Sequence, residues 1–269
     1  MRRGRLVATS LVFAVSAAAQ DTTRPAVRGP RPVPFNVGER LEYDVKFGFL
    51  RVGSGAMEVS RLDTVRGREA WHTVFSLRGG IPGFRVNDRY ESWMDTRTLS
   101  SLRYIQDINE GNYHPVRRFE FFPERQEFVQ DSQPPQPTVE HPLDEGSFLY
   151  FIRTIPLTVG MDTSFSDYFR PDRNPVRIRV LRKEKIRVPA GEFEAIVVQP
   201  VILKTNIFGE DGHAEVWLSD DDSRIMLQMK SKLSFGSLSL YLKSYRPAAP
   251  PTPTAKTPPP LPLPSAIQH

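Results

Sequence analysis

The histidines of this chain, whose side chains often act in acid–base catalysis or bind metal, lie far apart in the sequence. No two have the three- or four-residue spacing of a zinc-binding helix. The chain has no cysteine, which excludes disulfides, thiolate metal sites and cysteine nucleophiles. Distant side chains could converge in the fold, but the sequence itself predicts no catalytic residue, metal or cofactor. The histidines are His72, His114, His141, His213 and His269.

Two short segments match phosphate or calcium sites only in part. Gly48 to Ser54 has the glycine spacing of a phosphate-binding loop, but Ser54 stands where that loop needs a lysine. We interpret it as a hairpin with flexible glycines. Asp220 to Asp222 lacks the alternate acidic spacing and the glycine of a calcium loop. We interpret it as a solvated β-turn.

The charge of the chain indicates no nucleic-acid partner. The formal net charge is +5, and losing three arginines with a signal segment leaves about +2 (5 − 3). One hairpin is basic. It either contacts anionic lipid or lipopolysaccharide phosphate, or it is a solvated strand face whose charges discourage edge pairing, the interpretation we favour. Its cations are Arg177, Arg179, Arg182, Lys183, Lys185 and Arg187.

The elements that would position any site are mostly strands. Leu41, Tyr43 and Val45 alternate with Glu42 and Asp44, which is typical of a strand with one wet face. Similar runs recur as far as residue 245, separated by turns rich in glycine, proline or aspartate. We therefore predict an all-β, mainly antiparallel fold, either a single large curved sheet or a barrel-like meander.

One segment, Leu143 to Thr154, has helical spacing of its apolar residues. Asp144 can cap its start, and Pro156 and Gly160 end it. Its apolar face is wide, so we expect this helix to pack against or into the sheet.

Two predicted hairpins resemble each other. Glu91 to Asp95 and Glu215 to Asp220 both end a strand with tryptophan and an apolar residue, followed by an aspartate-bearing turn and a return strand. Their spacing is about 124 residues, as expected of an internal repeat. The sequence therefore indicates either two similar halves or a chance match of two hairpins.

The strands around these tryptophans are apolar on both faces. Because side chains alternate along a strand, Trp93 and Met94 point to opposite faces. Either the helix covers one face by simple core packing, or the sheet curls around an apolar cavity with the helix as a plug. On the cavity hypothesis the ligand-binding residues are Trp93, Trp217, Phe148, Phe151 and Ile152.

Both ends of the chain are predicted to lie outside the folded domain. Residues 1–19 combine a basic start, an apolar run and Ala17 to Ala19, as in a secretory signal peptide cleaved before Gln20. We predict a proline-rich, disordered lead-in at 20–34, a β domain at 35–246 and a proline-rich, disordered tail at 247–269. No cysteine is available for lipid attachment, and no other stretch is apolar enough to cross a membrane. We therefore expect a periplasmic or otherwise exported protein without a transmembrane segment after signal removal.

Five ordered motifs lie at Phe35 to Tyr43, Gly53 to Ala56, Pro142 to Arg153, Val188 to Phe193 and Trp217 to Asp221. Together they resemble an exported bacterial family, the domain of unknown function 3108. The resemblance covers roughly residues 35–245 and implies an exported envelope protein with a β-rich fold, without established catalytic residues. The tryptophan hairpins also resemble, in architecture, the half-barrels of periplasmic lipoprotein carriers.

These observations favour a non-enzymatic envelope protein that binds a lipid or another apolar small molecule in a curved sheet. The alternative is a structural or scaffolding protein that reaches an envelope partner through its proline-rich tail. A periplasmic enzyme is the third choice. An open apolar cavity would favour the first function, a filled interior the second, and a cleft with a histidine or carboxylate pair the third.

Overall fold

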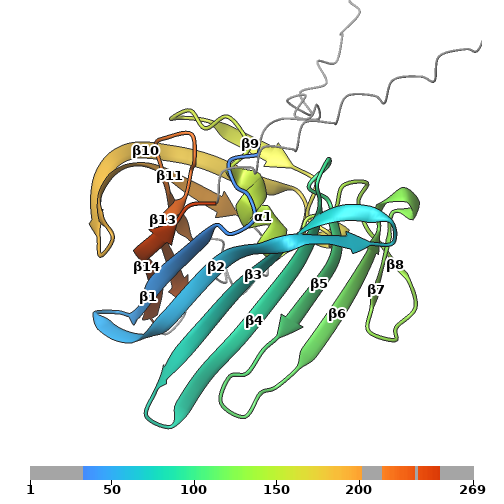
Figure 1. Cartoon of the computed structure of the whole chain (residues 1–269), viewed down its shortest axis with the longest axis horizontal. Coiled ribbons are helices and arrows are strands. Elements are labelled where there is room, and N and C mark those ends of the chain that lie inside the picture. Colours follow the sequence, from blue (N-terminus) through green and yellow to red (C-terminus); the bar gives the residue numbers. More distant parts are fainter. Residues whose placement is uncertain (1–32, 202–213, 234–235, 249–269) are drawn as a thin grey trace, which may run out of the picture.

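The computed structural model describes residues 33–201, 214–233 and 236–248 (Figure 1). The predicted signal peptide at 1–19 lies outside these residues. So do most of the predicted lead-in at 20–34 and most of the predicted tail at 247–269.

The described residues form one 14-stranded sheet, one α-helix and two 3₁₀ helices. The first strands are β1 (Arg40–Phe47), β2 (Leu50–Val65), β3 (Arg68–Ile81), β4 (Phe84–Asp95), β5 (Ser101–Asp107), β6 (Val116–Phe122), β7 (Glu127–Gln130) and β8 (Gln136–Pro137). The others are β9 (Asp162–Phe165), β10 (Val176–Val188), β11 (Gly191–Val201), β12 (Glu215–Ser219), β13 (Met226–Leu233) and β14 (Gly236–Arg246). The helices are η1 (Pro123–Arg125), α1 (Glu145–Ile152) and η2 (Pro171–Arg173).

The chain builds this sheet from two meanders that meet in its middle. The strand order is β8-β7-β6-β5-β4-β3-β2-β1-β14-β13-β12-β11-β10-β9. Strands β1 to β8 therefore proceed outward to one edge, and β9 to β14 return from the other edge until β14 pairs with β1. All paired strands are antiparallel. The sheet is barrel-like but not closed, because within the described residues β8 and β9 form its two ends. The predicted fold class is confirmed.

Helix α1 lies inside the curve of the sheet, on the route from β8 to β9 (Figure 1). Asp144 caps its start, because the side-chain Oδ1 accepts hydrogen bonds from Gly146 N at 2.8 Å and Ser147 N at 2.9 Å. The predicted helix and its cap are therefore confirmed. The face of the sheet that carries α1 is called the inner face below.

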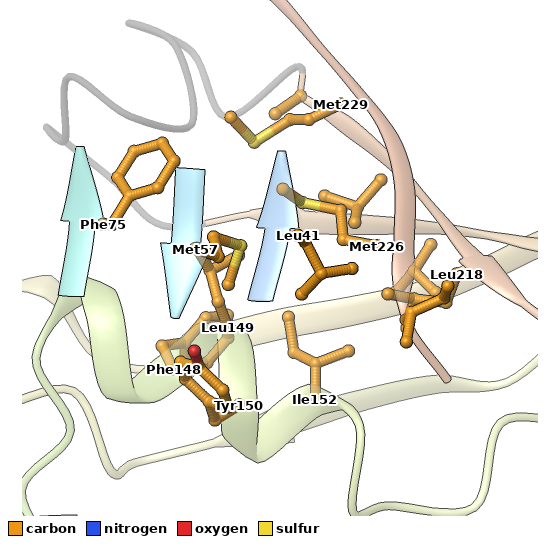
Figure 2. Close-up of a cluster of buried hydrophobic side chains, with 14 of the residues drawn as sticks. Leu41, Met57, Phe75, Phe148, Leu149, Tyr150, Ile152, Leu218, Met226 and Met229 are labelled. Atoms are coloured by element: carbon orange, nitrogen blue, oxygen red, sulfur yellow. The ribbon is translucent and has the colours of Figure 1, made fainter. Parts of the chain in front are cut away.

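The core lies between α1 and the inner face. Phe148, Leu149 and Ile152 are buried there with Leu41 and Met57 of the sheet (Figure 2). Burying a side chain of this size contributes about 1.5–3 kcal/mol. The short helix is thus stabilised by tertiary packing, since an isolated helix of this length is marginal in water.

An aromatic cluster links the two ends of the sheet without strand pairing. After β9 the chain runs beside the start of α1, where Leu143 N donates to the carbonyl of Asp167 at 2.7 Å. Phe169 then packs edge-on against Phe121 and Phe128, with ring centroids 5.4 Å apart in both pairs. The interior near β6 and β7 is therefore filled by side chains.

Candidate functional site

The space between α1 and the sheet is too small for a ligand. It measures about 10 Å³, which is room for about one water molecule. Leu149 and Ile152 face Val216, Leu218 and Met226 across it. The helix end of the interior is thus a packed core.

A larger pocket lies farther along the inner face, toward the hairpin ends of β1–β2 and β3–β4. Its volume is about 340 Å³, within the range of small-molecule sites. Strand β1 shows how it is positioned: inward-pointing Leu41 and Tyr43 belong to the core, and the next inward positions, Val45 and Phe47, line the pocket. The wall is almost wholly apolar; among its other side chains are Leu77, Phe84, Val86 and Leu238.

Glycines help to form this pocket. Gly53 of β2 pairs directly with Gly79 of β3, and both line the pocket. A Cβ atom on either residue would overlap the backbone of the opposite strand. The close approach of the two strands therefore requires glycine at both positions, and the missing side chains leave room inside the curve.

One wall of the pocket carries two carboxyl groups, Asp88 and Glu110. They share a side-chain hydrogen bond, and Asp88 Oδ1 accepts a further one from Asn109 N at 2.8 Å. Burial raises the pKa of both carboxyl groups, and the charge of Asp88 raises the pKa of Glu110 further. Such a pair retains a proton more readily than an exposed carboxylate. This wall can therefore donate or accept a hydrogen bond at the polar end of an otherwise apolar ligand.

Trp93 faces away from α1 and the pocket. It packs in a small cluster with Val65, Ala70 and Leu102 that is separate from the main core. Its indole Nε1 donates a hydrogen bond to Asp63 Oδ2 at 3.0 Å.

Trp217 also faces away from α1. Its neighbours Val216 and Leu218 point toward the helix, so the alternation of side chains turns Trp217 to the other face. Its Nε1 donates to Glu184 Oε1 at 2.6 Å. Trp93 thus lies apart from the core cluster that contains Phe148 and Ile152, whereas Trp217 belongs to that cluster. Arg103 lies over the ring of Trp93, and Arg182 and Lys230 lie over the ring of Trp217. Because side chains cover the outer face in this way, a strand that is apolar on both faces needs no cavity.

The three predicted helix residues lie together but do not line the larger pocket. Phe148 and Ile152 are buried in the core. Phe151 is half-buried and packs edge-on against Phe165 of β9, with ring centroids 5.4 Å apart. Whether any of the five predicted residues binds a ligand stays a prediction.

The residues that line the pocket were not among those predicted from the sequence, although part of the sequence pattern points to them. Val45 and Phe47 belong to the recognised alternation of β1, so their inward direction is predictable. Gly53 and Gly79 occupy positions where that alternation would otherwise place a side chain in the pocket. Only the pairing of β2 with β3 shows that these two glycines lie opposite each other.

The other segments considered for chemistry have structural roles. Gly48 adopts a φ of 57° in the β1–β2 hairpin, and Asp221 Oδ1 caps a turn by accepting from Ser223 N and Arg224 N, each at 3.0 Å. Within the described residues there is no group of three or more histidine, aspartate or glutamate side chains placed to hold a metal ion. Several cations of the basic hairpin form ion pairs; Lys183 Nζ, for example, lies 2.7 Å from Asp220 Oδ2.

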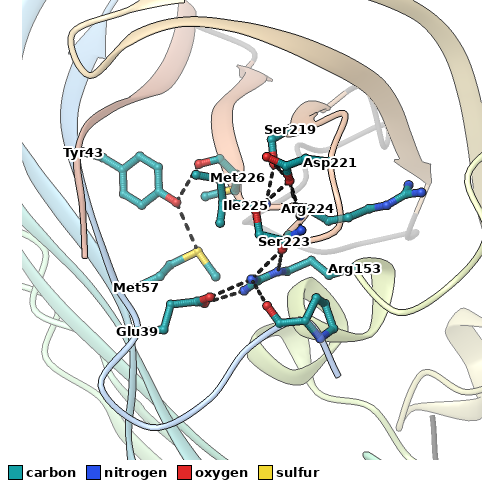
Figure 3. Close-up of polar contacts among 11 residues, drawn as sticks. Glu39, Tyr43, Met57, Arg153, Ser219, Asp221, Ser223, Arg224, Ile225 and Met226 are labelled. Atoms are coloured by element: carbon teal, nitrogen blue, oxygen red, sulfur yellow. Dashed lines mark hydrogen bonds and ion pairs between the residues drawn. The ribbon is translucent and has the colours of Figure 1, made fainter. Parts of the chain in front are cut away.

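A buried ion pair fixes the end of α1 (Figure 3). Arg153 binds Glu39 through two hydrogen bonds, of 2.6 and 2.9 Å, and donates to the carbonyls of Ser223 and Pro34 at 2.9 and 3.1 Å. Its charge and donors are thereby satisfied, as buried charges require. These contacts hold the entry to β1, the end of the helix and the β12–β13 turn together.

Comparisons with known proteins agree with the fold. The family model described as "Protein of unknown function (DUF3108)" matches residues 42–243. No curated protein matches the chain. One solved structure with a similar fold is a β-barrel-like protein of domain of unknown function DUF1849 from Brucella abortus. Its TM-score is 0.53 at 11% sequence identity, and the match covers 81% of this chain and 100% of that chain.

A more distant solved structure is a candidate lipoprotein from Parabacteroides distasonis, with a TM-score of 0.33 and 9% identity, covering 80% of this chain and 98% of that chain. The described part of the chain contains no helix with the length and apolarity needed to span a membrane.

Proposed function

The chain belongs to the DUF3108 family of proteins of unknown function, and from this premise we propose that it is a non-enzymatic, exported envelope protein that binds an apolar molecule inside its curved sheet. The observation that carries the proposal is the pocket of about 340 Å³ between β1–β4 and β14. Export is supported by the signal-peptide pattern at residues 1–19.

The lining of the pocket suits an acyl chain or a similar aliphatic group. Val45, Leu77 and Val86 offer apolar contact, and each methylene that they bury contributes about 0.8 kcal/mol. Asp88 and Glu110 disfavour a ligand whose only polar group is a carboxylate at their wall, because like charges repel there. The ligand class is therefore an apolar chain with a neutral or cationic polar end.

The test is a titration of the purified mature protein with a fluorescent apolar probe, such as a dansyl-labelled alkylamine. Val86→Lys places a cation in the pocket that repels the amine of the probe and competes for Asp88. We expect it to weaken binding at least about tenfold, since each tenfold corresponds to about 1.4 kcal/mol. The matched control is Asn87→Lys, because Asn87 is exposed and neighbours Val86 on the same strand. Equal affinities of these two variants would contradict the proposed site.

A third variant separates the pocket from the site predicted at the helix. Phe151→Asp changes a side chain that packs on Phe165 and not in the pocket. We expect unchanged affinity, with the melting temperature recorded to confirm folding. Weakened binding by a folded Phe151→Asp protein would move the ligand to the helix. Absence of saturable binding to the wild-type protein would favour a scaffolding function.

A further inference from the structure

The hairpin ends beside the pocket expose large apolar side chains. Phe49 is 89% and Leu50 53% exposed at the β1–β2 turn, and Ile81 is 51% and Phe84 45% exposed at the β3–β4 turn. Such side chains are normally scattered on a soluble protein. Here they gather on two neighbouring hairpins, and we call these four residues the apolar rim.

The apolar rim is continuous with the pocket. Ile81 and Phe84 line the pocket and are also exposed. Phe47 lies in the pocket two residues before Phe49. A molecule that leaves the pocket past Ile81 and Phe84 therefore stays in contact with apolar side chains.

Basic side chains surround the apolar rim. Arg51, Arg78 and Arg85 are exposed beside it. Arg51 pairs with Asp44 at 2.8 Å, whereas Arg78 and Arg85 form no ion pair with another described residue. An apolar surface flanked by arginines matches an anionic lipid surface, where apolar side chains enter the interface and cations meet headgroups.

We propose that the apolar rim docks on an anionic lipid bilayer, so that the pocket opens onto the membrane surface. The arginines bring the rim to the headgroups, and Phe49, as its most exposed member, inserts between them. This docking does not depend on a bound ligand, so it can be tested apart from the proposed function.

The experiment is flotation of the mature full-length protein with vesicles of phosphatidylcholine alone or mixed with phosphatidylglycerol. We expect binding to the anionic vesicles, weakened by salt. Phe49→Asp is expected to lower the bound fraction at least about tenfold, because a carboxylate replaces the inserting ring. The matched control, Val159→Asp, changes a residue that is 49% exposed outside the rim, and it should bind as the wild type does.

A second variant tests the charges. Arg85→Glu should lower the preference for anionic vesicles, because Arg85 is exposed beside the rim and does not line the pocket. Both variants should keep wild-type affinity for the dansyl alkylamine probe without vesicles, which distinguishes a failure of docking from a failure of the pocket. Equal flotation of Phe49→Asp and Val159→Asp would overturn the proposal. So would light scattering that shows a dimer of the wild type dissociated by Phe49→Asp, because the rim would then join two copies of the chain.

Discussion

The two tryptophan hairpins, β4–β5 and β12–β13, share a register shift and an aspartate-capped turn but hold α1 by different chemistry. In both, the register shifts directly after the tryptophan, at Trp93 and at Trp217. In both, an aspartate Oδ1 caps the turn by accepting from the backbone two and three residues later, Asp95 in the first and Asp221 in the second.

The similarity extends to the strand that lies two strands away from each tryptophan in the sheet. The indole of Trp93 reaches Asp63 on β2, and the indole of Trp217 reaches Glu184 on β10. Each of these acids also accepts a hydrogen bond from an arginine two residues earlier in its strand. The two halves of the sheet are thus similar around both hairpins, which favours the first of the two alternatives that the sequence left open.

The inner faces differ. Ser92 and Ser101 of the first hairpin donate to the Asp144 carboxylate at 2.6 and 2.7 Å. The corresponding positions of the second hairpin are Val216 and Met226, which face apolar residues of the helix. Polar contacts fix the start of α1 at one hairpin, and apolar burial stabilises its other side at the second. The two inward-pointing side chains of each hairpin therefore determine its role. Serines orient the start of the helix through hydrogen bonds, whereas apolar side chains bury the apolar face of the helix.

The largest expected effect is the loss of apolar packing at the second hairpin. Leu218→Ala should lower the free energy of unfolding by about 3 kcal/mol, because Leu218 is buried against α1 and its removal leaves a cavity. Urea denaturation followed by circular dichroism measures it. Asp222→Ala, in the exposed turn of the same hairpin, should stay within about 0.5 kcal/mol of the wild type. A similar small loss for Leu218→Ala would contradict burial as the role of this hairpin.

A pH-dependent effect is expected at the first hairpin. Burial raises the pKa of Asp144 to about 6, although Ser92, Ser101 and the backbone N–H of Ser147 pull it down. The folded state therefore binds the proton more tightly than the unfolded state, whose pKa is about 3.9. The resulting stabilisation is complete below about pH 4 and is lost as pH rises through about 6.

This loss amounts to at most about 3 kcal/mol, at about 1.4 kcal/mol for each pKa unit. Asp144→Asn cannot titrate at this position, so the difference in unfolding free energy between wild type and variant should change between pH 4 and 7. Urea denaturation of both proteins across that range measures the change. Parallel curves would mean that Asp144 keeps an ordinary pKa.

The sequence predicted those parts of the molecule that depend on local chemistry. Asp144 before an apolar helical run indicated the cap, and alternation within β1 indicated its inward side chains. The match around Trp93 and Trp217 made a repeated hairpin one of two alternatives, because the residues that form a turn are neighbours in the sequence.

The rest depends on which strands become neighbours. Both faces of β4 are apolar around Trp93, so alternation alone could not tell which face the sheet curls toward. The outer face is covered from other strands, since His72 of β3 stacks on Trp93 with ring centroids 4.2 Å apart. The pairing of β1 with β14 and of Gly53 with Gly79 is likewise non-local. The pocket that results was therefore not predictable from the spacing of apolar residues along the sequence.

The smallest expected effect tests whether the hairpins are equivalent on the outer face. Trp93→Phe and Trp217→Phe each keep an aromatic ring and lose one hydrogen bond from the indole N–H to a carboxylate. Each should lower the unfolding free energy by about 1 kcal/mol. Trp71→Phe is the matched control, because the buried Nε1 of Trp71 has no partner among the described residues, and its removal should cost less than about 0.5 kcal/mol. Urea denaturation of the three variants measures these losses. If the losses of unfolding free energy for Trp93→Phe and Trp217→Phe differ by more than about 1 kcal/mol, the two carboxylates bind their indoles unequally and the hairpins are similar only in their turns. If the two losses agree, the same hydrogen bond from tryptophan to an acid stabilises both halves of the sheet.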